Sequence, residues 1–337
     1  MQDVSKKTPK TKDIALDSTD TISQIFDKIL KRILLRLSKS AIIALINGLF
    51  GENFPTDSEV LFNATENLDG NLKKTMADII ITLRTKDRIC RFHVEGQISD
   101  DNTIVLRVFE YGFHDAVRHQ DPQGSEITLP FPKPIIIFLE HTSITPNTVT
   151  LVLDFEKQGQ FRYNVPTIKF LDYSVEELCE NQMVILLPLY LLKLRRAVEN
   201  AKLRKHHKEE ILRANAKKLK ELIEKSLLPA IAINEKAGNI THSDAFELLK
   251  LLSKLYDYLY GDIAIFKEEE VKSMLADTLV LEYDVEIAEI EARHESEKME
   301  MAHSLKREMA RKFKNDGVPT EVIARNTGFT ISEIDKL

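Results

Sequence analysis

The chain has 337 residues, of which 43% are hydrophobic and 30% charged, as expected of a globular protein with at least one sizeable core and, by default, two domains. A net charge of −6 argues against a protein that coats nucleic acid by charge alone. The two cysteines lie far apart and fit a reducing compartment. The apolar runs are half as long as a bilayer span, and no signal peptide is evident. We therefore expect a soluble cytoplasmic protein.

The first half of the chain predicts helices followed by strands. Residues 1–20 are polar and read as a disordered tail, and apolar residues recur at helical spacing from residue 21. A second helix is expected from Lys39 to Leu49, and another at 101–118. Short β-branched and aromatic runs predict strands at 58–65, 76–84, 88–98, 133–141, 148–155 and 160–168. This order favours an α/β or α+β sheet with helices packed on it.

After residue 173 the sequence predicts helices alone. Ser174 and Glu177 form the pattern of a capping box, and Pro188 is expected to kink or interrupt the helix that follows. Further helices are expected at 229–236, 242–260 and 268–314, with two short ones around a turn at Gly328. Residues 193–220 carry eleven Lys or Arg against three Glu; they form either a phosphate-facing surface or an ordinary solvated helix face.

Two neighbouring strands combine polar residues in an unusual way. In residues 76–84 the side-chain period of two puts an aliphatic series on one face and Asp78 on the other. In residues 88–98 His93, Glu95 and Gln97 share one face. A turn at 85–88 predicts an antiparallel hairpin, in which Asp78 and Glu95 could reach one cation.

The chemistry of these side chains points to a divalent ion. Two crowded carboxylates are costly unless a cation balances them, and hard oxygen ligands suit Mg²⁺ or Mn²⁺. Such an ion activates a bound water and stabilises charge on phosphorus. Asp78 and Glu95 are therefore assigned to metal binding, and Gln97 to orienting the water or the phosphate. His93 is expected to be structural.

The motifs resemble those of the PD-(D/E)XK nuclease superfamily, most closely its transposase-like branch of recombination-promoting nucleases. They are Asp78, "VEGQ" with Glu95 and Gln97, and "RVFEY" with Arg107 and Tyr111. Similar blocks are "NGLFG", "ITLPFPKPIIIFLE" and "VPTIKFLDYSVEEL", so the resemblance covers residues 40–200. Two departures are Gln97 in place of the usual Lys and the missing Pro before Asp78.

The resemblance implies an α/β, restriction-endonuclease-like mixed sheet flanked by helices, followed by an all-α C-terminal region. It implies a Mg²⁺- or Mn²⁺-dependent DNA endonuclease in which Asp78, Glu95 and Gln97 are catalytic and Arg107 and Tyr111 bind substrate. The C-terminal helices would dock DNA or a second subunit in a homodimer. Expected domains are a tail (1–20), a nuclease-like domain (21–195), a helical region (196–315) and a helix-turn-helix-like tail (316–337).

Several alternatives remain open at the level of sequence. Arg107 either clamps a phosphate or holds Glu95 while Tyr111 packs in the core. The whole chain is either a nuclease or a catalytically inactive nuclease-fold module that binds DNA or protein, and a coiled-coil partner protein would explain only its last third. The tail either reads DNA or packs as helices. The additional acid common near the first helix has three candidates, Glu52, Glu59 and Glu66.

Overall fold

The computed structural model describes residues 22–68, 74–98, 103–279, 306–315 and 318–336, without the side chains of 22–28, 63–68 and 74–79. The chain divides into two compact units, Met1–Leu279 and Val280–Leu337, which are described separately. Among the described residues, no helix has both the length and the apolar character needed to cross a membrane.

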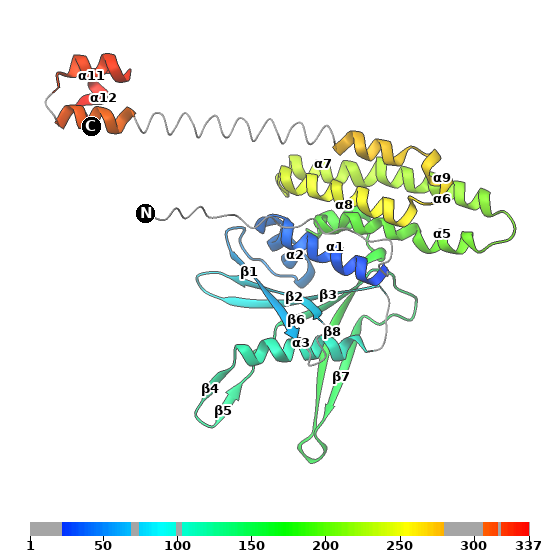
Figure 1. Ribbon diagram of the computed structural model, residues 1–337. Helices are drawn as coiled ribbons and strands as arrows, with labels where there is room; N and C mark the ends of the chain where they lie inside the picture. The colour runs from blue at the N-terminus through cyan, green and yellow to red at the C-terminus, as the bar shows by residue number, and fades with distance from the viewer. Residues whose placement is uncertain (1–21, 69–73, 99–102, 280–305, 316–317, 337) are drawn as a thin grey trace. The chain divides into compact units, whose positions relative to one another are not determined.

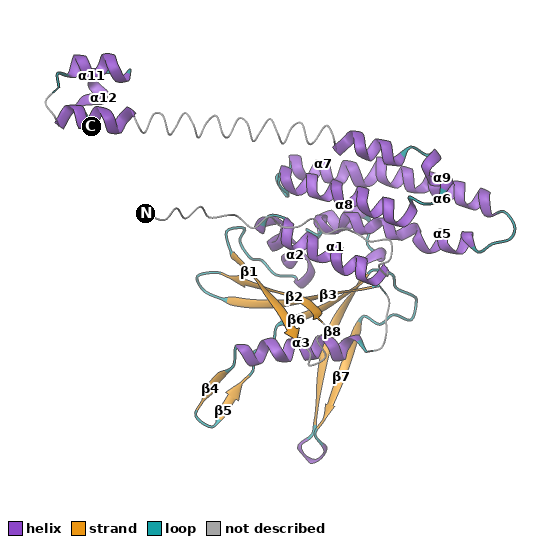
Figure 2. Ribbon diagram, in the orientation of Figure 1, coloured by secondary structure: helices purple, strands orange, loops and turns teal. Residues whose placement is uncertain are grey.

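The first unit contains a mixed six-stranded sheet in the order β1-β2-β3-β6-β8-β7 (Figures 1 and 2). β3 is antiparallel to β2 and parallel to β6, β6 is parallel to β8, and β7 closes the edge antiparallel to β8. The six strands are β1 Glu59–Leu68, β2 Lys74–Arg84, β3 Ile89–Gln97, β6 Lys133–Phe138, β7 Thr148–Asp154 and β8 Gln160–Lys169. All six were predicted from the sequence, and a mixed α/β sheet is confirmed. A small hairpin, β4 Asp121–Gln123 and β5 Glu126–Thr128, was not predicted.

One face of the sheet packs against the first two helices, α1 Ile22–Arg36 and α2 Lys39–Phe50 (Figure 1). The aliphatic series predicted to face the core does so, since Ile81 and Leu83 are fully buried in the same cluster as these helices. On β3, Gly96 lies on this face, and a Cβ there would come within 2.8 Å of Leu30 Cδ2. Glycine therefore allows α1 to approach β3 closely.

The other face of the sheet is also buried. The helix α3 Ile104–Arg118 covers it, and the apolar side of this helix packs on Ile136 and Phe138 of β6 and on Val165 of β8. Because β6 is buried on both faces, its sequence is a nearly continuous aliphatic run. His93 and Glu95, on the polar face of β3, are thus buried on the side that α3 covers, and Thr82 of β2 is buried as well.

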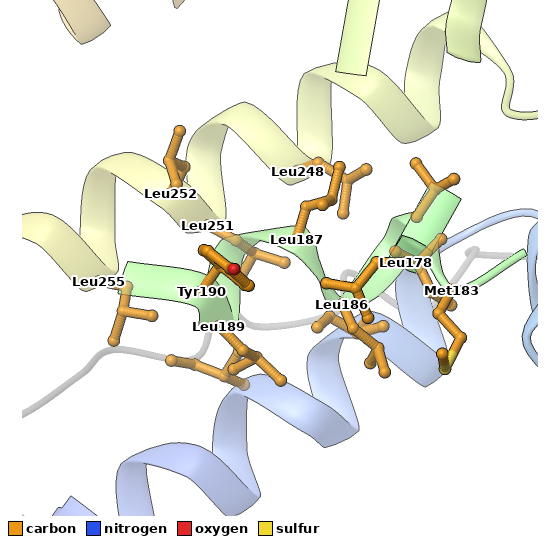
Figure 3. Packing of buried hydrophobic residues seen from close by; sticks show 14 of the residues in the cluster. Leu178, Met183, Leu186, Leu187, Leu189, Tyr190, Leu248, Leu251, Leu252 and Leu255 are labelled. Atoms are coloured by element: carbon orange, nitrogen blue, oxygen red, sulfur yellow. The ribbon is translucent and has the colours of Figure 1, made fainter. Parts of the chain in front are cut away.

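Helices make up the rest of the first unit. Ser174 and Glu177 form the predicted capping box at the start of α4 Val175–Glu180. Pro188 interrupts the α-helix as predicted, and the interruption is longer than a local kink, because η3 Val184–Leu194 is 3-10 helix throughout. The leucines of η3 pack against α8 His242–Tyr260, as Figure 3 shows. The remaining elements are η1 Glu156–Gln158, η2 Phe170–Asp172, α5 Arg195–Lys202, α6 Lys208–Leu222, the π-helical turn Ile223–Leu227, α7 Leu228–Lys236, α9 Ala264–Glu268 and a helix at 271–279.

The amphipathic stretch expected from about residue 268 begins as a helix at residue 271. A turn at 269–270, with Glu270 at φ 57°, separates α9 from the next helix, and residues 280–305 lie outside the described part of the chain. In the second unit a helix at 306–315, α11 Thr320–Thr327 and α12 Ile331–Asp335 share a small core. Gly328 ends α11 in the left-handed conformation at φ 77°, as the predicted turn requires. DNA reading or helical packing by this tail stays a prediction.

Asp244 joins two helix starts in the first unit. Its carboxylate accepts hydrogen bonds from the backbone N–H and the hydroxyl of Ser38, at 2.6 Å each, and from those of Thr241, at 2.9 and 2.8 Å. Ser38 is the N-cap of α2 and Thr241 the N-cap of α8. Asp244 is 2% exposed, so these four bonds replace its hydration.

We therefore expect Asp244→Ala to lower the free energy of unfolding by about 2–4 kcal/mol, because two caps lose their acceptor in a buried position. Urea denaturation measures this. The matched control is Glu177→Ala, which removes the acid of the solvent-exposed capping box at α4 and should cost under about 1 kcal/mol. Equal losses for the two variants would contradict the role given to Asp244.

Candidate functional site

The hairpin of β2 and β3 has the predicted antiparallel form. Thr85 N–H donates to Arg88 O at 2.9 Å across the turn, and the ladder runs to Ile79 opposite Val94. The next positions on the two strands are Asp78 and Glu95. The side chain of Asp78 lies outside the described part of the structure, so its approach to Glu95 stays a prediction.

Glu95, Gln97 and Arg107 come together at the carboxyl end of β3. The guanidinium Nη2 of Arg107 donates to Glu95 Oε1 at 2.7 Å and to Gln97 Oε1 at 3.1 Å. The Glu95 side chain is 3% exposed, whereas that of Arg107 is 40% exposed. The structure thus joins three of the residues predicted for the site, and it favours the alternative in which Arg107 holds Glu95.

The pair belongs to a series of contacts between β3 and α3, which we call the polar ladder. Its three rungs are Glu95–Arg107, His93–Tyr111 and Arg91–Asp115. Successive rungs are two residues apart on the strand, about 6.6 Å, and four residues apart on the helix, about 6 Å. Because the residue numbers fall along β3 as they rise along α3, the two spacings match with strand and helix running in opposite directions. The polar face of β3 is therefore the face on which α3 docks.

The middle rung consists of two rings. His93 is fully buried, and its ring centroid lies 6.1 Å from that of Tyr111 in an edge-on arrangement. Tyr111 is 8% exposed. This predicted substrate-binding residue lies on the side of α3 that faces β3, where it packs against His93 as the structural alternative requires.

The third rung was missed at the level of sequence. Asp115 is fully buried, Arg91 Nε lies 2.8 Å from its Oδ2, and His119 Nδ1 lies 2.8 Å from its backbone oxygen. The available signal was the spacing of polar residues at 107, 111 and 115 in the helix against 95, 93 and 91 in the strand. Each spacing is ordinary in itself, and only their match indicates docking.

The candidate acids near the first helices have other partners. Glu52 accepts hydrogen bonds from Lys133 and from Arg88, which together lower the pKa of its carboxyl, with Lys133 the larger cause. Lys133 is paired with Phe92, whose ring faces α1 and α2, so Glu52 lies on the face opposite Glu95. Glu59 pairs with Arg84 at the surface, and the side chain of Glu66 lies outside the described residues.

A second buried carboxylate lies just beyond Gln97. Glu140 N–H donates to Ile98 O at 2.8 Å, which continues the pairing of β3 with β6. The 2% exposed carboxylate of Glu140 accepts two hydrogen bonds from Arg195, both at 2.5 Å, and one from Arg196 at 2.9 Å. Hydrogen bonding to Glu140 raises the pKa of Arg195. Two of the eleven basic residues at 193–220 thus fix α5 to the sheet edge instead of forming a free basic surface.

No group of three His, Cys, Asp or Glu suited to a metal occurs among the described side chains, a set that excludes Asp78. Comparison with known proteins finds no matching family model, no matching curated protein and no matching solved structure.

We expect Asp115→Ala to destabilise the protein by about 3–5 kcal/mol, because Arg91 then keeps a charge in a site that is 12% exposed without its carboxylate partner. The measurement is the free energy of unfolding in urea. The double variant Arg91→Met with Asp115→Leu should recover most of this loss, since it leaves no buried charge. Additive losses in the double variant would show that the two side chains act independently.

Proposed function

We propose that the protein is a metal-dependent DNA endonuclease of the PD-(D/E)XK type, related to recombination-promoting nucleases. The observation that carries this proposal is the buried carboxylate of Glu95 near the end of a central strand, beside Gln97. Glu95 and Asp78 each occupy the position that follows the last pair of the β2–β3 ladder, Ile79 and Val94. The element order, two helices, a three-stranded meander, a helix and a parallel extension of the sheet, supports a restriction-endonuclease-like arrangement.

The donor set fits a hard divalent ion. Asp78 and Glu95 would hold Mg²⁺ or Mn²⁺ through carboxylate oxygens, which these ions prefer. The bound ion would supply a water of lowered pKa and stabilise charge on the phosphate. Gln97 is oriented by its acceptor contact with Arg107, so its amide N–H groups are left to donate to a phosphate oxygen or to the attacking water. Arg107, partly exposed, adds a positive charge beside the same position.

The expected partner is DNA. One such site hydrolyses one strand, so a double-strand break requires two subunits or two successive nicks. The C-terminal helices are the proposed place for contact with DNA or with a second copy of the chain. For the same reason, a monomer should produce nicked circles before linear plasmid.

The second candidate function is a catalytically inactive nuclease-fold module that binds DNA or protein. The contact between Arg107 and Glu95 favours it, because a guanidinium already balances the carboxylate that the metal would need. Calorimetric titration with Mn²⁺ separates the two functions: the module releases no heat and gains no thermal stability from the ion.

The nuclease proposal predicts that the purified protein nicks supercoiled plasmid with Mg²⁺ or Mn²⁺ and not with EDTA. Glu95→Gln and Asp78→Asn should each reduce nicking by about 100-fold or more, since each removes charge from the metal site. The readout is the rate of conversion to open circles on agarose gels.

The matched control is Glu52→Gln, which neutralises an acid of the same unit on the opposite face of the sheet and should leave the nicking rate unchanged. Nicking that persists in both site variants would remove Asp78 and Glu95 from the mechanism. Absence of nicking and of Mn²⁺ binding in the unmodified protein would leave the inactive module as its function.

A further inference from the structure

The contact between Arg107 and Glu95 is asymmetric in its access to solvent. The carboxylate is 3% exposed, while the guanidinium side chain is 40% exposed. A buried carboxylate is stabilised in its ionised form by a nearby positive charge or by hydrogen-bond donors. Arg107 supplies that charge to Glu95 in this structure, at 2.7 Å from Oε1.

A divalent ion at Glu95 would place a second positive charge against the same carboxylate. Like charges at such short range repel, most strongly where water is excluded. The side chain of Arg107 is the partner that borders solvent, whereas the carboxylate of Glu95 is buried on β3. An ion at Glu95 would therefore displace the more exposed partner of the contact, which is Arg107.

We propose that Arg107 is the exchangeable counter-ion of the metal site: it neutralises Glu95 while no divalent ion is bound and leaves the carboxylate when one binds. This inference rests on the proposed function and adds a regulatory element to it. Such an exchange keeps the carboxylate of Glu95 neutralised with and without the divalent ion. It lowers the affinity for the ion, because the contact between Arg107 and Glu95 must break before the ion binds. Gln97, the second acceptor of Arg107, keeps the displaced guanidinium beside the site.

The other charged rung of the polar ladder provides the comparison. Arg91 is only 12% exposed, its partner Asp115 is fully buried, and it also donates to the backbone oxygen of Pro130. The side chain of Arg91 is thus less exposed than that of Arg107, at 12% against 40%. The two arginines link the same strand to the same helix, yet only Arg107 contacts the proposed metal ligand.

The test is calorimetric titration of the full chain with Mn²⁺. Arg107→Met should bind Mn²⁺ about 10-fold more tightly than the unmodified protein, a typical size for competition between two ligands of one site. Arg107→Lys keeps the positive charge and should stay near the unmodified affinity. Arg91→Met, the matched control, removes an arginine from the same junction and should lower thermal stability without changing Mn²⁺ affinity.

Circular dichroism checks folding, and Arg107→Gln replaces the Met variant if the latter does not fold, with the same tightening expected. Mn²⁺ binding of equal or lower affinity in the neutral Arg107 variants overturns the counter-ion role while leaving the nuclease proposal intact. Glu95→Gln provides the baseline without binding. Absence of Mn²⁺ binding in the unmodified protein and in all Arg107 variants overturns both proposals together.

Discussion

The arrangement of the first unit depends on how α3 docks onto β3. This strand presents apolar residues to α1 and α2 on one face and a charged and aromatic series to α3 on the other. Because every rung of the polar ladder pairs a strand side chain with a helix side chain, the docking fixes the helix in one register: a shift by one turn would place Arg107 opposite His93 and Tyr111 opposite Arg91. A purely apolar interface would tolerate such a shift at lower cost.

The same docking explains how an acid comes to be buried at the end of a strand. Glu95 lies where the apolar contacts of α3 with β6 and β8 give way to the polar ladder, so its carboxylate is covered yet remains next to a side chain that reaches solvent. Glu140 repeats the principle one strand away, with Arg195 and Arg196 fixing α5. Two buried acids, each balanced by arginine, thus connect the sheet to the helices around its carboxyl edge. Glu140 is held by two arginines that are fixed to the sheet, whereas the arginine that contacts Glu95 is 40% exposed.

A fold does not establish an activity, and the proposed nuclease depends on side chains rather than on the sheet. The hairpin register, the burial of Glu95 and the contact of Gln97 with Arg107 are consistent with a divalent-ion site. A carboxylate paired with arginine, like Glu95 with Arg107, is equally what a catalytically inactive form of such a site would retain. The proposed counter-ion exchange would reconcile the two, because the arginine contact would then be the resting state of a site that opens to an ion.

The sequence by itself determined the secondary structure of the sheet and most helices, because period-two and helical patterns with clear turn residues set them locally. It also determined which face of β2 and β3 is apolar, and hence that Glu95 and Gln97 share a face with His93. The small β4–β5 hairpin and the turn at 269–270 were not predicted, because such short elements carry little local sequence pattern. Only the tertiary structure decided what covers the polar face. The α3 side chains that contact Glu95, His93 and Arg91 lie 12 to 24 residues further along the chain. Pairing them with the strand residues requires a direction of docking between helix and strand that no local sequence pattern contains. For the same reason the sequence could not place Glu52 on the opposite face or join Glu140 to Arg195: partners of a buried charge are chosen by packing in three dimensions.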